Sequence, residues 1–327
     1  MFQRILVIRG GAIGDFILTL PALKALCEAH PDAHIEILGY KHIAVLAENR
    51  FYAQAVRSIE YGPLASFFAK NSELPAELEG FFASFDLIIS YLHDPDRIFE
   101  SNLDRCGVEN LLCGPARIIE KSSHAARQLA RPIEQLGIKV GDLTEKVFLS
   151  DEDRQFAQGF LRGSSQAIVA IHPGSGSKKK NWSLENWIEL VSGEGGSSKA
   201  KGELGQIGKQ LSLVVVSGEA DNAQTAQLEH ELKDRDIRFA KNLSLPHLAA
   251  VLEHTSFVGH DSGISHLAAA AGANCILLFG PTDPTVWAPR NENVRVLRGQ
   301  SGRLNALDVS QVRAAVTTAL RPVLSRA

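Results

Sequence analysis

Short, continuous apolar runs recur along the first half of the chain, and glycine or polar residues follow them. The runs lie at residues 4–8, 35–38, 55–59, 86–91 and 109–113. Runs without a polar alternation are typical of strands that are buried on both faces of a parallel sheet. Helical patterns alternate with these runs, at residues 16–30, 42–48, 76–82 and 122–136. This alternation of strands and helices predicts a doubly wound parallel sheet of the α/β class.

The second half repeats the alternation. Its predicted strands lie at residues 167–171, 211–216, 257–260 and 275–279, and its predicted helices at residues 152–162, 182–191, 222–234 and 264–271. Residues 141–150 carry no such pattern and predict a crossing between two domains. We therefore expect one domain over residues 1–150 and a second over residues 151–307. A last helix, within residues 308–327, could pack back on the first domain.

The stretch from 257 to 289 has the strongest pattern in the chain: a strand, a polar turn, an alanine-rich helix and a second strand. Ligands of open α/β sheets bind at the carboxyl ends of strands, and the start of a helix favours an anion. The residues expected to face one crevice there are Asp261, Ser262, Gly263 and His266. A simpler alternative is that Asp261 or Ser262 only caps the helix and that His266 is a packed core residue.

Two further strand ends of the second domain carry polar residues. The strand at 167–171 runs into His-Pro-Gly-Ser-Gly-Ser-Lys-Lys-Lys-Asn-Trp, which includes Ser175, Gly176 and Lys180. Backbone donors, hydroxyls and ammonium groups suit a pyrophosphate, although a solvated basic loop is an equal alternative. Glu219 follows the strand at 211–216 and could accept hydrogen bonds from sugar hydroxyls, or cap the next helix. Residues 192–201, rich in glycine and serine, predict a surface loop.

The first strand ends in a glycine-rich turn that does not fit the dinucleotide-binding fingerprint. Arg9 stands where that motif needs glycine, and Tyr40 follows the second strand where an acidic residue would hold a ribose. A nicotinamide-dependent dehydrogenase is therefore a weak alternative. Asp15 lies at the start of the helix after this turn. It is a candidate base, or only a carboxylate that stabilises the first helical turn.

Composition narrows the class of protein. The 327 residues are 45% hydrophobic and carry a net charge of −3, which argues against nucleic-acid binding through general electrostatics. The four cysteines form no C-x-x-C pair, so neither a metal site nor a disulfide framework is expected. No apolar window reaches the length of a membrane span, and the first residues predict a strand rather than a signal peptide. We expect a cytoplasmic α/β protein.

Four motifs, in order along nearly the whole chain, resemble glycosyltransferase family 9, the bacterial heptosyltransferases of lipopolysaccharide synthesis and their relatives. They are RGGAIGDFILTLPALKAL, IHPGSGSKKKNWSLENW, VVVSGEADNA and FVGHDSGISHLAAAAGANCILLFGPTDPTVWAP. The resemblance implies a GT-B fold, in which two Rossmann-like domains enclose an interdomain cleft. It also implies inverting, metal-independent transfer of a sugar, such as an ADP-activated heptose, to a lipid-linked saccharide at the membrane surface. No cofactor is then expected beyond the nucleotide-sugar substrate.

The same resemblance assigns roles to individual residues. Asp15 matches the family's catalytic base, and Lys180 matches the lysine that meets the donor phosphates. Glu219 matches an acidic residue near the donor ribose. The remaining matches to the donor site are Ser175 and Gly176 in the phosphate turn and Asp261, Ser262, Gly263 and His266 in the last motif.

A cluster of basic residues in the first domain predicts where the acceptor binds. The candidate acceptor contacts are Gly14, Arg117, Lys121, His124 and Arg127, with Arg131 on the same stretch. An anionic, lipid-linked sugar would need such a cluster, which could also hold the protein peripherally at the inner membrane. A solvated basic helix is the alternative. Two other functions stay open at this point, a sugar-nucleotide epimerase of the same fold and a non-catalytic nucleotide-sugar-binding protein.

Overall fold

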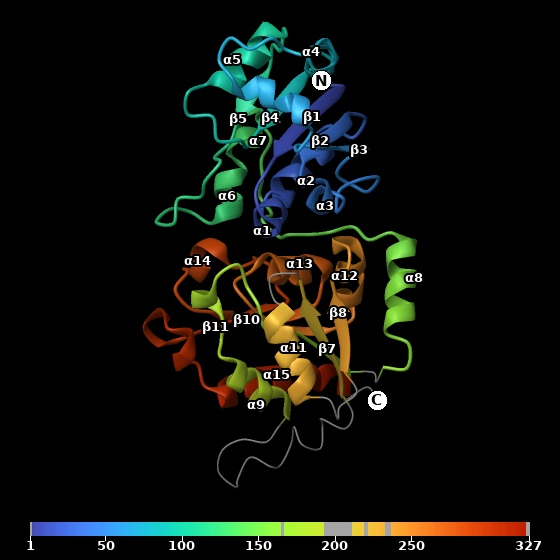
Figure 1. Ribbon diagram of the computed structural model, residues 1–327, viewed down its shortest axis with the longest axis vertical. Helices are drawn as coiled ribbons and strands as arrows, with labels where there is room; N and C mark the ends of the chain where they lie inside the picture. Colours follow the sequence, from blue (N-terminus) through green and yellow to red (C-terminus); the bar gives the residue numbers. More distant parts are fainter. Residues whose placement is uncertain (1, 165–166, 193–210, 219–221, 233–236, 325–327) are drawn as a thin grey trace. The chain divides into compact units, whose positions relative to one another are not determined.

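The computed structural model describes residues 2–164, 167–192, 211–218, 222–232 and 237–324 (Figure 1). The chain divides into two compact units, Met1–Phe148 and Leu149–Ala327. Each unit contains one parallel sheet with helices between its strands. Glu219 and residues 193–201 of the predicted surface loop lie outside the described residues.

The sheet of the first unit has the strand order β3-β2-β1-β4-β5, and its neighbouring strands are parallel. The strands are β1 (Arg4–Arg9), β2 (His34–Gly39), β3 (Ala55–Ser58), β4 (Leu87–Ser90) and β5 (Leu111–Cys113). The helices are α1 (Ile13–Ile17), α2 (Leu20–Ala29), α3 (Lys41–Ala44), α4 (Ala76–Ala83), α5 (Ile98–Arg105), α6 (Ala125–Leu129) and α7 (Arg131–Gln135), with a 3₁₀ segment η1 (Gly62–Phe68). The central strand β1 is apolar and buried from Ile5 to Ile8, which accounts for its continuous hydrophobic run.

Two predicted helices of this unit are each divided in the structure. The helix expected at 16–30 is α1 followed by α2, and the boundary lies at Thr19. The Thr19 hydroxyl and the Arg9 guanidinium both donate to the carbonyl oxygen of Asp15, at 2.8 and 3.0 Å. Pro21, in the first turn of α2, has no N–H for a bond four residues back. Pro132 has the same effect between α6 and α7, so the helix expected at 122–136 is divided as well.

The sheet of the second unit has the strand order β11-β10-β9-β6-β7-β8, again with parallel neighbours. The strands are β6 (Ala167–His172), β7 (Leu211–Ser217), β8 (Ile237–Lys241), β9 (Ser256–His260), β10 (Asn274–Phe279) and β11 (Val294–Arg298). The helices are α8 (Asp151–Phe160), α9 (Leu184–Ser192), α11 (Asn222–Glu231), α12 (Leu245–Glu253), α13 (Gly263–Ala271), α14 (Pro284–Trp287) and α15 (Val309–Leu324), with 3₁₀ segments η2 (Lys178–Lys180), η4 (Gln300–Gly302) and η5 (Leu304–Ala306).

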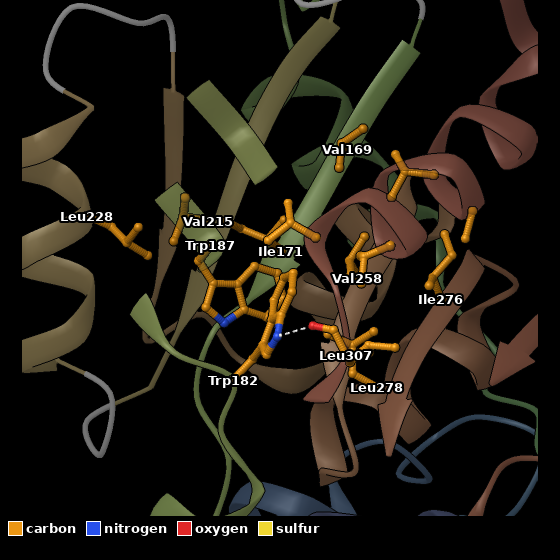
Figure 2. Close-up of a cluster of buried hydrophobic side chains, with 14 of the residues drawn as sticks. Val169, Ile171, Trp182, Trp187, Val215, Leu228, Val258, Ile276, Leu278 and Leu307 are labelled. Atoms are coloured by element: carbon orange, nitrogen blue, oxygen red, sulfur yellow. Dashed lines mark hydrogen bonds between the residues drawn. The ribbon is translucent and has the colours of Figure 1, made fainter. Parts of the chain in front are cut away.

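The core of the second unit lies between its sheet and the helices α9, α11 and α15 (Figure 2). Two fully buried indoles, Trp182 and Trp187, meet edge to face in it at 5.4 Å between ring centroids. The Trp182 Nε1–H donates to the carbonyl oxygen of Leu307 at 3.1 Å. Helix α15 contributes apolar side chains such as Val312 and Val316 to this core. Helix α15 therefore packs on the sheet of its own unit, and its packing on the first domain stays a prediction.

Each sheet has one point where the strand order reverses direction. In the first unit this point lies between β1 and β4, and in the second unit it lies between β6 and β9. A crevice opens at the carboxyl ends of the strands at such a point, and ligands of doubly wound sheets bind there. The turn that leads to Asp15 follows β1, and the segments with Lys180 and Asp261 follow β6 and β9. The strand orders therefore place these candidate residues at the two reversal points.

Candidate functional site

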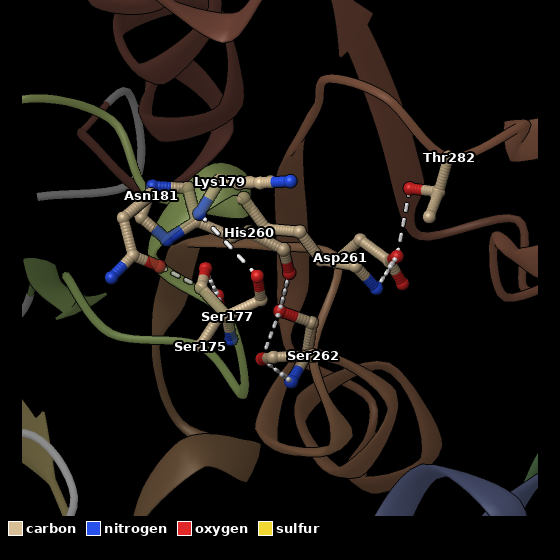
Figure 3. A network of polar contacts seen from close by, with 10 residues as sticks. Ser175, Ser177, Lys179, Asn181, His260, Asp261, Ser262 and Thr282 are labelled. Carbon is tan, nitrogen blue, oxygen red and sulfur yellow. Dashed lines mark hydrogen bonds and ion pairs between the residues drawn. The ribbon is translucent and has the colours of Figure 1, made fainter.

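Three segments of the second unit meet through the carboxylate of Asp261, which lies directly after β9. The Lys180 ammonium, from the segment after β6, lies 2.6 Å from Asp261 Oδ2. The Thr282 hydroxyl, from the segment after β10, donates to the same oxygen at 2.8 Å (Figure 3). The Lys180 side chain is 31% exposed and that of Asp261 is 9% exposed. The partly exposed Lys180 ammonium is thus held at the carboxyl ends of the central strands by the nearly buried Asp261 carboxylate.

The start of α13 lies beside this network. Ser262 is the N-cap of the helix, and its hydroxyl accepts a hydrogen bond from the Ser265 N–H at 3.3 Å. The capping interpretation is therefore correct for Ser262, but the carboxylate of Asp261 is engaged by Lys180 and Thr282. The first N–H groups of a helix have no partner within the helix, and its dipole favours negative charge at that end. An anion that met Lys180 here would also meet the start of α13.

The glycine-rich segment after β6 is folded on itself. The Ser175 hydroxyl lies 2.6 Å from Asn181 Oδ1 and 2.8 Å from the carbonyl oxygen of Ser177 (Figure 3). Its hydrogen bonds are thus internal to the segment, whereas Gly176 is exposed. Lys179 is also exposed, and its neighbour Lys180 is the lysine that reaches Asp261. The geometry therefore separates two lysines that the sequence pattern alone does not distinguish.

Sequence reasoning missed a histidine in the middle of this site. His260 is fully buried, and its ring contacts both ends of the segment after β6: Nε2 lies 2.8 Å from the Trp182 N and Nδ1 lies 3.3 Å from the Gly174 O. The signal was available, because His260 ends an otherwise apolar strand directly before Asp261. The predicted contact His266 is 3% exposed and lies in the first turns of α13.

In the first unit, Asp15 occupies the third position of α1. Its Oδ2 accepts a hydrogen bond from the Ala12 N–H at 2.9 Å, so the carboxylate does stabilise the helix start. Its Oδ1 lies 3.7 Å from Arg9 Nη2, and the Asp15 side chain is 35% exposed. Gly11 has φ +95°, and a Cβ at that position would lie 2.8 Å from Asp15 Oδ2. Position 11 therefore needs glycine if the Asp15 carboxylate is to keep this place.

Arg9 is the second functional residue that the sequence analysis missed. There it was noted only because it stands where the dinucleotide fingerprint needs glycine. Its side chain is 4% exposed, and its Nε donates to the Thr19 hydroxyl at 3.0 Å. The guanidinium also lies over the ring of Tyr91, 5.5 Å from the centroid. Burial lowers the pKa of Arg9, and the Asp15 carboxylate opposes that change. A buried cation thus lies beside the predicted base.

The basic residues predicted to bind the acceptor form two groups, those already engaged within the protein and those exposed to solvent. His124 is the N-cap of α6, is 5% exposed, and accepts a hydrogen bond from the Ala126 N–H. Arg127 Nη1 binds Glu134 Oε1 at 2.8 Å, so its charge is paired. The exposed cations of the stretch are Arg117, Lys121 and Arg131, and Gly14 lies within α1 next to Asp15.

Within the described residues, no group of three or more histidine, cysteine, aspartate or glutamate side chains is arranged to hold a metal ion. Within the same ranges, no helix combines the length and the apolar character needed to cross a bilayer.

Two Rossmann-like units in one chain are the architecture of the GT-B glycosyltransferases. The family model for glycosyltransferase family 9 (heptosyltransferase) matches residues 117–313, more than half of the chain. This chain belongs to glycosyltransferase family 9. The predicted fold class, the resemblance and the glycosyltransferase activity are thereby confirmed, and the epimerase and binding-protein alternatives are set aside.

Individual proteins agree with this assignment. Lipopolysaccharide heptosyltransferase 3 of Escherichia coli (strain K12) is 26% identical over 86% of this chain and 83% of its own length. The crystal structure of a family 9 glycosyltransferase from Veillonella parvula has a TM-score of 0.76 at 18% identity and covers 99% of this chain and 98% of that one. The structure of E. coli ADP-heptose lps heptosyltransferase II has a TM-score of 0.76 at 16% identity, covering 98% of this chain and 99% of that one. At such identities the structures support the fold alone.

Proposed function

We propose that this chain transfers a heptose from ADP-heptose to a lipopolysaccharide core or a related surface glycan, with inversion at the anomeric carbon. The substrate class is taken from the names of similar proteins: the sequence relative is named a lipopolysaccharide heptosyltransferase, and a protein of the same fold is named an ADP-heptose heptosyltransferase. The observation that carries the proposal is the position of Lys180 beside the start of α13, at the reversal point of the second sheet.

The donor diphosphate fits this position chemically. A lysine ammonium has three N–H donors, and the contact with Asp261 uses one of them. The others can meet phosphate oxygens while Asp261 and Thr282 keep the side chain in place. The start of α13, beginning at Gly263, adds backbone N–H groups and the positive end of the helix dipole. The segment around Ser175 and Gly176 supplies a close approach of the backbone, and Glu219 is proposed to contact the donor ribose.

Asp15 is the general base that we propose for this reaction. The acceptor hydroxyl oxygen attacks the anomeric carbon and loses its proton to the Asp15 carboxylate. The bond between the anomeric carbon and the diphosphate oxygen breaks, and ADP leaves with the electron pair. Attack on the face opposite the leaving group inverts the anomeric configuration. Lys180 and the start of α13 stabilise the charge that develops on the diphosphate, so no metal ion or other cofactor is required.

The exposed cations Arg117 and Lys121 are the acceptor contacts that we propose in the first unit. They suit an anionic, lipid-linked saccharide and attraction to an acidic membrane surface. We place the enzyme in the cytoplasm, peripherally at the inner membrane. His124 and Arg127 are less suited to the acceptor, because a helix cap and the pairing with Glu134 already occupy them.

Transfer tests this function directly. The purified protein is incubated with ADP-heptose and with lipopolysaccharide from a heptose-deficient strain. Mass spectrometry should show the acceptor heavier by one heptose, and ADP release should depend on the acceptor. UDP- and GDP-sugars should give no product. If the protein converts the donor alone, or transfers only from another nucleotide sugar, the proposed reaction is wrong.

A further inference from the structure

His260 bridges the two ends of the segment that carries Lys180. The segment leaves β6 at His172 and enters α9 at Leu184. The His260 ring meets the Gly174 carbonyl oxygen near the first end and the Trp182 N–H near the second, at 3.3 and 2.8 Å. The next residue, Asp261, holds the Lys180 ammonium. His260 thus contacts the segment near both of its ends, and the next residue, Asp261, contacts Lys180 between them.

These contacts fix the chemical form of the His260 ring. A backbone N–H can only donate, so Nε2 must be the unprotonated nitrogen that accepts from Trp182. In the neutral ring the proton is then on Nδ1, which donates it to the Gly174 carbonyl oxygen. Trp187 lies edge-on to the ring at 5.3 Å between centroids, and His260 is fully buried. The ring therefore has one orientation, set by a donor on one side and an acceptor on the other.

We propose that His260 is a positioning residue for the donor diphosphate: it sets the conformation of residues 174–182 and so the place of the Lys180 ammonium. The inference rests on the proposed function, since it assumes that Lys180 meets the diphosphate. It differs from a packing role, because packing needs only the volume of the ring, whereas positioning needs both ring nitrogens. Substitutions that keep the volume or one nitrogen at a time separate these roles.

Three variants carry the test. His260→Phe keeps an aromatic ring against Trp187 but bonds neither Gly174 nor Trp182. His260→Gln places an amide oxygen near the position of Nε2, where it can accept from Trp182. His260→Asn places an amide N–H near the position of Nδ1, where it can donate to Gly174. His254→Phe, at an exposed histidine after α12, is the matched control.

Calorimetric titrations with ADP and with adenosine give the readout. We expect His260→Phe to raise the Kd for ADP about tenfold. This corresponds to the loss of one or two hydrogen bonds between the displaced Lys180 ammonium and the diphosphate. The Kd for adenosine should stay within about twofold of the wild-type value. His260→Gln and His260→Asn should each recover part of the ADP affinity, and His254→Phe should bind like wild type. In transfer assays the KM for the donor should rise while the KM for the acceptor is unchanged.

Several outcomes overturn the inference. ADP affinity that is unchanged in His260→Phe shows that the ring does not position the phosphate site. Equal weakening of ADP and adenosine shows a general structural role. If His260→Phe does not fold, the amide variants decide the question: wild-type ADP affinity in both refutes positioning, and phosphate-specific loss in either supports it. A wild-type protein that binds ADP no more tightly than adenosine contradicts the proposed donor site itself, which distinguishes the two failures.

Discussion

Replacing Lys180 by methionine removes the ammonium group but keeps most of the apolar stem. A hydrogen bond to a charged group contributes about 1.5–3 kcal/mol. The Kd for ADP should therefore rise roughly 10- to 150-fold. Adenosine, which lacks the diphosphate, should bind as it does to the wild type.

The same change has a smaller effect on stability. The Asp261 carboxylate is 9% exposed and would keep only the Thr282 hydroxyl of its two described side-chain donors. The Lys180 side chain is 31% exposed, so solvent already screens the ion pair. The free energy of unfolding should fall by about 1 kcal/mol, the upper end for partly exposed pairs. The variant should thus stay folded at the temperature of a binding assay.

Isothermal titration of ADP and adenosine into the wild type, Lys180→Met and Lys179→Met measures these effects on matched proteins. Lys179 is the adjacent, exposed lysine, and its loss should change the Kd for ADP less than about threefold, as expected for a surface charge. The assignment of Lys180 to the diphosphate is refuted if adenosine affinity falls together with ADP affinity. It is also refuted if Lys179→Met weakens ADP binding as much as Lys180→Met does.

Three other predictions concern the turn before Asp15, helix α4 and the donor site. Gly11→Ala should lower the free energy of unfolding by about 1–3 kcal/mol, because φ is +95° and the new Cβ would crowd Asp15. Gly80→Ala, inside α4 with open space around it, should raise that energy by about 0.5–1 kcal/mol in the same denaturant titrations. Transfer should be unchanged by EDTA, because Lys180 supplies the positive charge; loss of activity that Mg²⁺ restores would contradict this.

The sequence predicted the strands of the first sheet and the central strands of the second, but not the two edge strands of the second sheet. β1 and β9 are buried along nearly their whole length, so their apolar runs are continuous and easy to recognise. The edge strands β8 and β11 are only partly buried and carry arginine and lysine, so they were not predicted. Helix α12 was missed as well, although it is nearly all buried, since its apolar residues show no clear polar face.

Helix divisions depend on contacts that a sequence pattern does not contain. Apolar periodicity continues through Thr19, and nothing local shows that Arg9 donates to the Asp15 carbonyl oxygen. Pro21 was the available signal, but proline is also common in the first turn of a helix. The break could therefore be placed only once β1 and α1 were seen together.

For the site, the sequence predicted which residues lie at strand ends but not which strand ends are neighbours. Lys180 and Asp261 are far apart in the chain, and they meet because β6 and β9 are adjacent at the reversal point. The pairing of Arg127 with Glu134 was likewise invisible, because charge patterns do not show side-chain direction. His260 was missed although it lies within the fourth motif, because the resemblance assigned it no role.

The proposed base offers the most direct test of the account. Asp15→Asn keeps the size of the side chain and an oxygen that can accept from the Ala12 N–H, so the protein should fold. The amide cannot take the acceptor's proton, and a general base contributes about 10²–10⁴-fold to the rate. Heptose transfer and the Kd for ADP are measured on one preparation of wild type and variant. If Asp15 is the base, transfer falls by at least about 100-fold while the Kd changes less than about twofold. Transfer that persists near the wild-type rate would contradict this role.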